Sequence, residues 1–272
     1  MAGKKTPLIT LTTDFGWRDA YVAAMKGVIY AMDPALRVVD LTHDISPQDV
    51  FEGSLFLAGA LPYFPKGTVH VAVVDPSVGT GRHPVAVSAG GQIIVCPDNG
   101  LPSLFLREHP LQEARIITNP RFMRETVSAT FHGRDVFAPA AAHLARGAPL
   151  HELGDELDTL VMLDIPRPRK ESAECIRGEI MHVDRFGNLV TNIQQSLLRN
   201  VTPLTIRAGR HHVRGIHRAY ADVAPGRTLA LFGSSGYLEI AVNGANAHAA
   251  LRLNQGDEVI VTLKPAAPPK EG

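Results

Sequence analysis

Three residues with chemically active side chains each stand directly after an apolar or β-branched segment. Asp14 follows Thr13, Asp75 follows Val74 and His132 follows Phe131. If these segments are neighbouring strands of one sheet, their carboxyl ends meet at one edge and the three side chains converge there. Arg82 lies just beyond Asp75, across a glycine-rich turn. A nucleophilic substitution requires a substrate clamp, a charge pair and a proton acceptor, and this set could supply all three.

Each of these residues also has a structural interpretation. Asp14 could cap the helix that follows it, or it could accept the hydroxyl protons of a ribose. Asp75 and Arg82 could form a surface ion pair, or the arginine could hold an anion or steer a hydroxide. The glycines of this turn do not form a phosphate-binding loop, because the sequence has no GxxxxGK[ST] motif.

His132 is one of 12 histidines, and its position between an expected strand and an expected helix distinguishes it. A metal site formed by Asp75, His83 and His132 is one alternative. The sequence contains no HExxH, HxH or paired-carboxylate motif, so we expect no metal ion.

The composition favours a globular protein that acts on small molecules or other protein chains. In 272 residues, 27 Lys and Arg balance 27 Asp and Glu. Without a basic excess we expect no nucleic-acid partner, and no uncharged apolar run approaches the roughly 18 residues of a membrane helix. Cys96 and Cys175 form no CxxC motif, and residues 1–5 do not read as the start of a signal peptide. These features predict a cytoplasmic protein without disulfides.

Apolar periodicity predicts an N-terminal α/β domain over residues 1–165. Strands are expected at 8–13, 36–41, 69–74, 84–87, 93–96 and 127–131, and helices at 17–32, 47–61 and 136–145. Strands that alternate with helices predict a mainly parallel sheet with helices on both faces.

The hydrophobic pattern of the sequence changes after a proline-rich, basic stretch at 166–173, which we interpret as a linker. Short alternating runs punctuated by turn residues then predict a smaller antiparallel β-barrel over 174–272. Two of its turns, 184–188 and 233–237, could be ordinary hairpin turns. Their aromatic, amide and hydroxyl groups would also suit a heterocycle and an amino-acid head group.

Six ordered segments together resemble the S-adenosyl-L-methionine hydroxide adenosyltransferases, adenosine-forming hydrolases related to fluorinase and chlorinase. The resemblance covers nearly the whole chain. It rests on Thr13-Asp14-Phe15-Gly16 with Asp19-Tyr21-Val22, on the runs 43–50 and 74–79, on Phe131-His132-Gly133-Arg134-Asp135, on the run 184–192, and on Gly233-Ser234-Ser235-Gly236-Tyr237.

This resemblance implies a homotrimer in which each active site lies between one subunit's first domain and a neighbour's second domain. It also implies a role for each matching residue. Asp75, Arg82 and His132 would position and activate water; we favour His132 as the base, either by itself or as part of a unit of these three residues whose members are not ranked individually. Asp14 would bind the ribose hydroxyls, Phe186 and Asn188 the adenine, and Asp184 and Ser234 the methionine head group, with Tyr237 and Val242 nearby.

Three positions distinguish the chain from fluorinase. Asp75 replaces a tyrosine, Gln48 replaces a tryptophan, and Gly133 stands where fluorinase has its halide-binding serine, a pattern that resembles chlorinase. A carboxylate at Asp75 would repel a halide and could orient water through Arg82. These differences favour a hydrolase.

The resulting hypothesis is hydrolysis of S-adenosyl-L-methionine (SAM) to adenosine and L-methionine, by in-line attack of activated water at the ribose C5′. SAM is then a substrate, and no cofactor is expected. Alternatives are a non-catalytic module that binds or senses a nucleoside or SAM, a SAM-dependent halogenase, and, with least support, a metal-dependent phosphoesterase.

Overall fold

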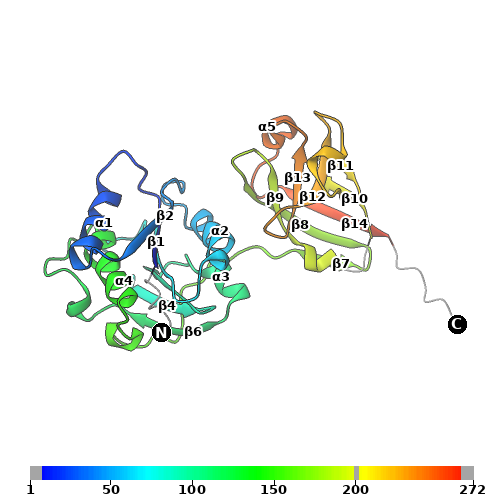
Figure 1. Ribbon diagram of the computed structural model, residues 1–272. Coiled ribbons are helices and arrows are strands. Elements are labelled where there is room, and N and C mark those ends of the chain that lie inside the picture. The colour runs from blue at the N-terminus through cyan, green and yellow to red at the C-terminus, as the bar shows by residue number, and fades with distance from the viewer. Residues whose placement is uncertain (1–7, 199–201, 265–272) are drawn as a thin grey trace, which may run out of the picture. The chain divides into compact units, whose positions relative to one another are not determined.

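The computed structural model describes residues 8–198 and 202–264. The chain divides into two compact units between Leu163 and Asp164, here called the N-terminal and C-terminal units (Figure 1). Residues 1–5, which led us to expect no leader, lie outside the described residues, as do the outer ends of both expected domains. No helix among the described residues is long and apolar enough to cross a membrane.

The N-terminal unit contains one mixed sheet of six strands. These are β1 (Leu8–Thr13), β2 (Arg37–Thr42), β3 (Val69–Val73), β4 (Pro84–Ala89), β5 (Gln92–Pro97) and β6 (Leu111–Ile116). The spatial order is β2-β1-β3-β5-β4-β6. The first four strands in this order run parallel, whereas β4 is antiparallel to both β5 and β6. The expected mainly parallel sheet is confirmed.

Helices cover both faces of this sheet (Figure 1). They are α1 (Tyr21–Met32), α2 (Val50–Ala60), α3 (Ser103–Glu108) and α4 (Ala138–Ala145). Strand β3 shows why both faces need cover. Val71 and Val73 pack into a core with α1 and α4, whereas Ala72 and Val74 pack into a second core with α2 and α3. A strand that is buried on both faces reads as a continuous apolar run, as this one does in the sequence.

The C-terminal unit is an antiparallel, nearly closed barrel, which confirms the second part of the expected fold. Its strands are β7 (Arg169–Ser172), β8 (Cys175–Val183), β9 (Leu189–Gln194), β10 (Thr202–Ala208), β11 (His211–Arg214), β12 (Thr228–Phe232), β13 (Tyr237–Val242) and β14 (Glu258–Lys264), with one helix, α5 (Ala247–Leu251). The path is β11-β10-β14-β8-β9-β13-β12, with β7 added beside β8. Its two ends meet where the His217 N–H donates to the Ala230 carbonyl, at 2.7 Å.

Short helical turns complete the two units. They are 3₁₀ turns at Leu61–Tyr63, Pro120–Phe122, Leu150–Leu153, Gln195–Leu198 and Tyr220–Asp222, and a π-helical turn at Gly133–Phe137.

Two local expectations were wrong. Residues 127–131 form a loop and not a strand, because the buried carboxylate of Asp135 takes the Ser128 N–H that a strand would pair. The π-helical turn that follows continues directly into α4. In the expected linker, residues 169–172 instead form β7, an edge strand that an ion pair from Glu171 to Arg177 fastens to β8.

Candidate functional site

Strands β1 and β3 deliver two carboxylates to the same edge of the N-terminal sheet. The strands are parallel neighbours, and Thr13 pairs with Val73 in their register. Asp14 comes one residue after Thr13, and Asp75 comes two residues after Val73. The two carboxylates therefore follow neighbouring strand ends at the same edge of the sheet.

A cavity of about 360 Å³ lies at this edge, here called the N-terminal cavity. Three residues singled out in the sequence, Asp14, Asp75 and His132, are on its wall. The other lining residues are Phe15, Tyr21, Pro47, Gln48, Val73, Pro76, Val78, Thr130, Phe131 and Gly133. Arg82 is not part of this lining, so it acts from behind the wall.

Arg82 joins the other two members of the predicted set. Its Nε lies 3.1 and 3.0 Å from the two oxygens of Asp75, and its Nη2 also donates to Asp75 Oδ2. The same Nη2 lies 2.8 Å from His132 Nδ1. The side chains of Arg82 and Asp75 are only 6% and 5% exposed. Such a buried, bidentate pair holds its geometry far better than an exposed ion pair does.

The contact with Arg82 determines the state of the His132 ring. A guanidinium can only donate, so Nδ1 must accept, and the proton of a neutral imidazole then sits on Nε2. Burial lowers the pKa of His132, and the nearby charge of Arg82 lowers it further. The ring is therefore neutral near pH 7, and its Nε2–H is a hydrogen-bond donor.

A glycine and a buried aspartate bring the His132 segment to this cavity. Gly79 has a φ of 79°, and a Cβ there would lie 2.5 Å from the Ala129 carbonyl oxygen, so the Asp75 loop packs against the turn before His132. Asp135 is fully buried and accepts from the Ser128 N–H and from the guanidinium of Arg134, with a second arginine, Arg124, also bonded.

Burial alone would raise the pKa of Asp135, but these hydrogen bonds outweigh it and lower the pKa to about 2. Asp135 therefore ties the loop to the helical turn that begins after His132. In the sequence, Asp135 stands out only as the last residue of the segment Phe131-His132-Gly133-Arg134-Asp135.

Asp14 is fastened to a second loop by a backbone contact. Its Oδ2 accepts from the Gln48 N–H at 2.8 Å. Gln48 has a φ of 66°, a left-handed conformation that is unusual for a residue other than glycine. The strained residue and the carboxylate both line the N-terminal cavity.

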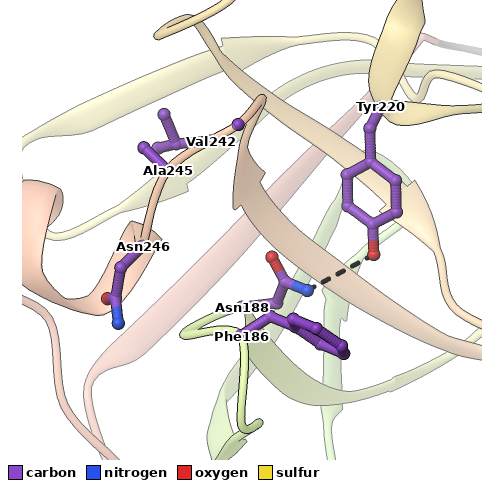
Figure 2. A pocket seen from close by; sticks show the side chains of 7 residues that line it. Phe186, Asn188, Tyr220, Val242, Ala245 and Asn246 are labelled. Atoms are coloured by element: carbon purple, nitrogen blue, oxygen red, sulfur yellow. Dashed lines mark hydrogen bonds between the residues drawn. The ribbon is translucent and has the colours of Figure 1, made fainter.

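The C-terminal unit has its own cavity, of about 510 Å³, here called the C-terminal cavity (Figure 2). Three residues predicted from the sequence, Phe186, Asn188 and Val242, line it. The remaining lining residues are Tyr220, Gly244, Ala245 and Asn246, which sequence reasoning missed. Phe186 is 79% exposed, so its ring is available to stack on a planar ligand.

Asp184 supports this cavity from behind. Its Oδ1 accepts from the backbone N–H groups of Phe186 and Asn188, at 2.9 and 2.8 Å, and its Oδ2 accepts from Asn188 Nδ2 at 2.9 Å. The other two predicted residues do not line the cavity. Ser234 is exposed on its turn, and the hydroxyl of Tyr237 accepts from Gln194 Nε2 at 3.4 Å.

A hydrogen-bond chain extends from Asn188 into the barrel. Asn188 Nδ2 donates to the Tyr220 hydroxyl at 3.3 Å (Figure 2). The Tyr220 hydroxyl donates in turn to the buried Glu239, also at 3.3 Å. Burial raises the pKa of Glu239, the bond from Tyr220 lowers it, and the charge of Asp184 raises it again, with a net rise. Tyr220 and Glu239 belong to no local motif, so only the folded barrel reveals them.

Among the described residues, no three His, Cys, Asp or Glu side chains gather closely enough to hold a metal ion. The alternative set of Asp75, His83 and His132 does not form such a group.

Comparisons with known proteins point to one family. Models of the SAM hydroxide adenosyltransferase N-terminal and C-terminal domains match residues 9–154 and 178–260. An (R)-S-adenosyl-L-methionine hydrolase from Salinispora tropica is 44% identical over 262 residues, which cover 94% of this chain and 98% of that protein. A fluorinase from Actinoplanes sp. is 31% identical over 222 residues, 72% of this chain and 74% of that protein. The crystal structure of an uncharacterized conserved protein from Thermotoga maritima superposes with a TM-score of 0.86 and 37% identity, over 93% and 99% of the two chains.

Proposed function

This chain belongs to the SAM hydroxide adenosyltransferase family, and we propose on that premise that it hydrolyses SAM to adenosine and L-methionine. The observation that supports this reaction most directly is the N-terminal cavity. Asp75 and His132 share its wall, and Arg82 bridges them from behind.

The proposed reaction is a direct displacement. The oxygen of a water molecule bonds to the ribose C5′ while the bond from C5′ to sulfur breaks, and both electrons of that bond stay on sulfur. The sulfonium becomes the neutral thioether of methionine, and one proton is released from the water. Because the sulfonium is already a good leaving group, the enzyme needs only to hold the water in line and to accept this proton.

The contacts of His132 favour a different proton acceptor from the one expected. We favoured His132 as the base, by itself or within the Asp75–Arg82–His132 unit, but its Nδ1 accepts from Arg82 and its Nε2 carries a proton. We therefore assign His132 to orient the water and Asp75 to receive the proton, with Arg82 holding both groups. Alignment of water and substrate contributes up to ~7–11 kcal/mol in the best intramolecular models, and base assistance about 10² to 10⁴-fold.

The substrate contacts follow the same premise. In this proposal Asp14 binds the ribose hydroxyls, and Phe186 and Asn188 hold the adenine, with Val242 beneath it. Asp184 and Ser234 would bind the methionine ammonium and carboxylate, with Tyr237 beside them. Asp184 already accepts three hydrogen bonds from its own turn, and a carboxylate has about four acceptor positions, so one remains for an ammonium.

The two sets of contacts lie in different units, and we propose that a homotrimer completes each active site from the N-terminal unit of one subunit and the C-terminal unit of a neighbour. No cofactor is required by this reaction. A cytoplasmic location is also part of the proposal, supported by Cys96 and Cys175, which are both free thiols.

A halogenase is the second candidate, because a fluorinase is among the relatives. The surroundings of Gly133 argue against a fluorinase-type halide site, which has a serine at this position. A Cβ at this position would lie 3.2 Å from Met25 Sδ, 3.2 Å from the Phe131 ring and 3.4 Å from the Phe15 ring. A serine would have to displace these groups, and the carboxylate of Asp75 on the same cavity wall would repel a halide.

The test is a product assay with purified protein and SAM, in the presence of chloride, fluoride or a chelator. We expect equal amounts of adenosine and methionine over many turnovers, with no halogenated nucleoside and no loss of rate on chelation. A 5′-halo-5′-deoxyadenosine product would support the halogenase, and bound but unreacted SAM would support a binding module.

A further inference from the structure

The loop that holds Asp14 is supported by a chain of polar side chains that takes no part in the proposed chemistry. This chain consists of Lys26, Asp40, His43 and Thr13. Thr13 is fully buried and His43 is 1% exposed, so neither can touch a substrate. The Asp14 loop is defined here as residues 13–16.

Each pair of neighbours in this chain is joined by a hydrogen bond between their side chains. Lys26 Nζ donates to Asp40 Oδ2 at 2.5 Å, and His43 Nε2 lies 3.0 Å from Asp40 Oδ1. A carboxylate can only accept, so Nε2 carries a proton, and in the neutral ring Nδ1 accepts from the Thr13 hydroxyl, 2.8 Å away. Burial alone would raise the pKa of Asp40, but the bonds from Lys26 and His43 outweigh it and lower the pKa, so the carboxylate stays ionised.

The chain ends on the backbone of the Asp14 loop. The Thr13 hydroxyl accepts from the Phe15 N–H at 3.2 Å, and the His43 carbonyl accepts from the Gly16 N–H at 2.8 Å. His43 thus contacts the loop on both sides of Asp14. The Gln48 N–H, bonded to Asp14 itself, adds a third contact from the same stretch of chain.

We propose that His43, with Thr13 as its contact, is a positioning residue that sets the Asp14 carboxylate for the two ribose hydroxyls. This inference rests on the ribose role given to Asp14 in the proposed function. Its signature is selective: loosening the chain should weaken only the part of the binding energy that comes from the hydroxyls. A merely structural role would weaken all ligands alike.

β1 offers a matched pair of substitutions for the test. Thr13→Val removes the hydroxyl that links His43 to the loop, and Thr13→Ser restores a hydroxyl. Thr12→Val is the control, because Thr12 is 1% exposed and its hydroxyl has no hydrogen-bond partner among the described residues. All three changes are small, and valine suits a buried strand.

The measurement is calorimetric affinity for adenosine and for 2′,3′-dideoxyadenosine, with SAM turnover followed in parallel. We expect Thr13→Val to lose about three- to tenfold in affinity for adenosine, the usual effect of one net hydrogen bond, and less than about twofold for the dideoxy ligand. Thr13→Ser should recover most of the loss, and Thr12→Val should match the wild type.

Equal losses for both ligands, or no loss in Thr13→Val, would overturn the proposal while leaving SAM turnover by the wild type intact. Absence of that turnover would instead contradict the proposed function. Wild-type protein that binds adenosine and the dideoxy ligand equally would overturn both this proposal and the ribose role of Asp14.

Discussion

The two cavities of this molecule are built in opposite ways. In the N-terminal cavity the groups assigned to the chemistry are ionic and immobilised, and Arg82 is hidden behind the wall that it organises. In the C-terminal cavity the chain of contacts is made of an amide, a phenol and a buried carboxyl group, and the ring of Phe186 is mostly exposed. This difference agrees with the proposed roles, in which the N-terminal cavity is preorganised for the reaction and the more exposed C-terminal cavity binds the substrate.

The largest expected effect comes from replacing the guanidinium of Arg82, which contacts both Asp75 and His132. Arg82→Lys keeps a charge but cannot bond both oxygens of Asp75 and also His132. We expect turnover to fall about 10²- to 10³-fold, the range seen when one preorganised donor is lost, with adenosine affinity within about threefold of the wild type. Arg210→Lys, on an exposed turn, should leave both unchanged. Equal losses of turnover and affinity would contradict the division between reaction and binding.

The next effect is an acid limb in the pH profile. Protonated His132 cannot accept from Arg82, so activity should disappear as pH falls through the pKa of the ring. Burial and the charge of Arg82 lower that pKa below the usual histidine value of 6.5. We expect kcat/KM to be flat near neutrality and to drop about tenfold per pH unit below a midpoint under 6.5. A midpoint above 6.5, or the same limb in His132→Asn, would contradict this role.

A smaller effect is expected at the binding surface. Phe186→Leu removes a stacking ring that supports little of the fold, because the ring is 79% exposed. We expect KM for SAM to rise about three- to tenfold, consistent with a stacking contribution of ~0.5–1.5 kcal/mol, while kcat changes little. Tyr63→Leu is the control, an equally exposed aromatic that lines neither cavity. A fall in kcat larger than the rise in KM would place Phe186 on the reaction side of the comparison.

The last comparison concerns stability and not activity, and here the two regions should respond to pH with opposite signs. The pKa of Asp135 is lowered to about 2, so its contribution is complete above the unfolded value of 3.8 and is lost as pH falls towards 2. The pKa of Glu239 is raised above 4.5, so the folded state holds a proton more tightly than the unfolded state does. Its contribution to stability is complete below pH 4.5 and is lost as the pH rises through the higher pKa of the folded state.

Denaturant unfolding of Asp135→Asn and Glu239→Gln at several pH values measures both effects. Asp135→Asn should cost about 2 kcal/mol near neutrality and remove the part of the acid-induced loss of stability that comes from Asp135. Glu239→Gln should flatten the decline above pH 4.5. Parallel stability curves for wild type and both variants would contradict these assignments.

The sequence was sufficient where local pattern and tertiary environment agree. The apolar run before Asp75 predicted a buried strand, and the positions of Asp14 and Asp75 followed from the neighbouring parallel strands. The alternation of short strands likewise predicted the barrel. The segment before His132 was misread because its β-branched residues favour a strand, whereas the buried carboxylate of Asp135 holds it as a loop.

Other features depend on contacts that no local pattern contains. Tyr220 and Glu239 come together with Asn188 from three separate parts of the barrel. Sequence reasoning left open whether Arg82 forms a surface ion pair with Asp75 or steers a hydroxide, and only the folded chain shows that it is buried and contacts both Asp75 and His132. The tautomer of His132 is also a product of tertiary contact, and it changed the proposed proton acceptor.

The most direct test of the central claim is incubation of the purified protein with SAM in ¹⁸O-labelled water, followed by mass spectrometry of the products. Attack of water on C5′ predicts that each new adenosine carries one ¹⁸O in its 5′-hydroxyl, and that methionine carries none. Unlabelled adenosine, or label in methionine alone, would contradict displacement at C5′.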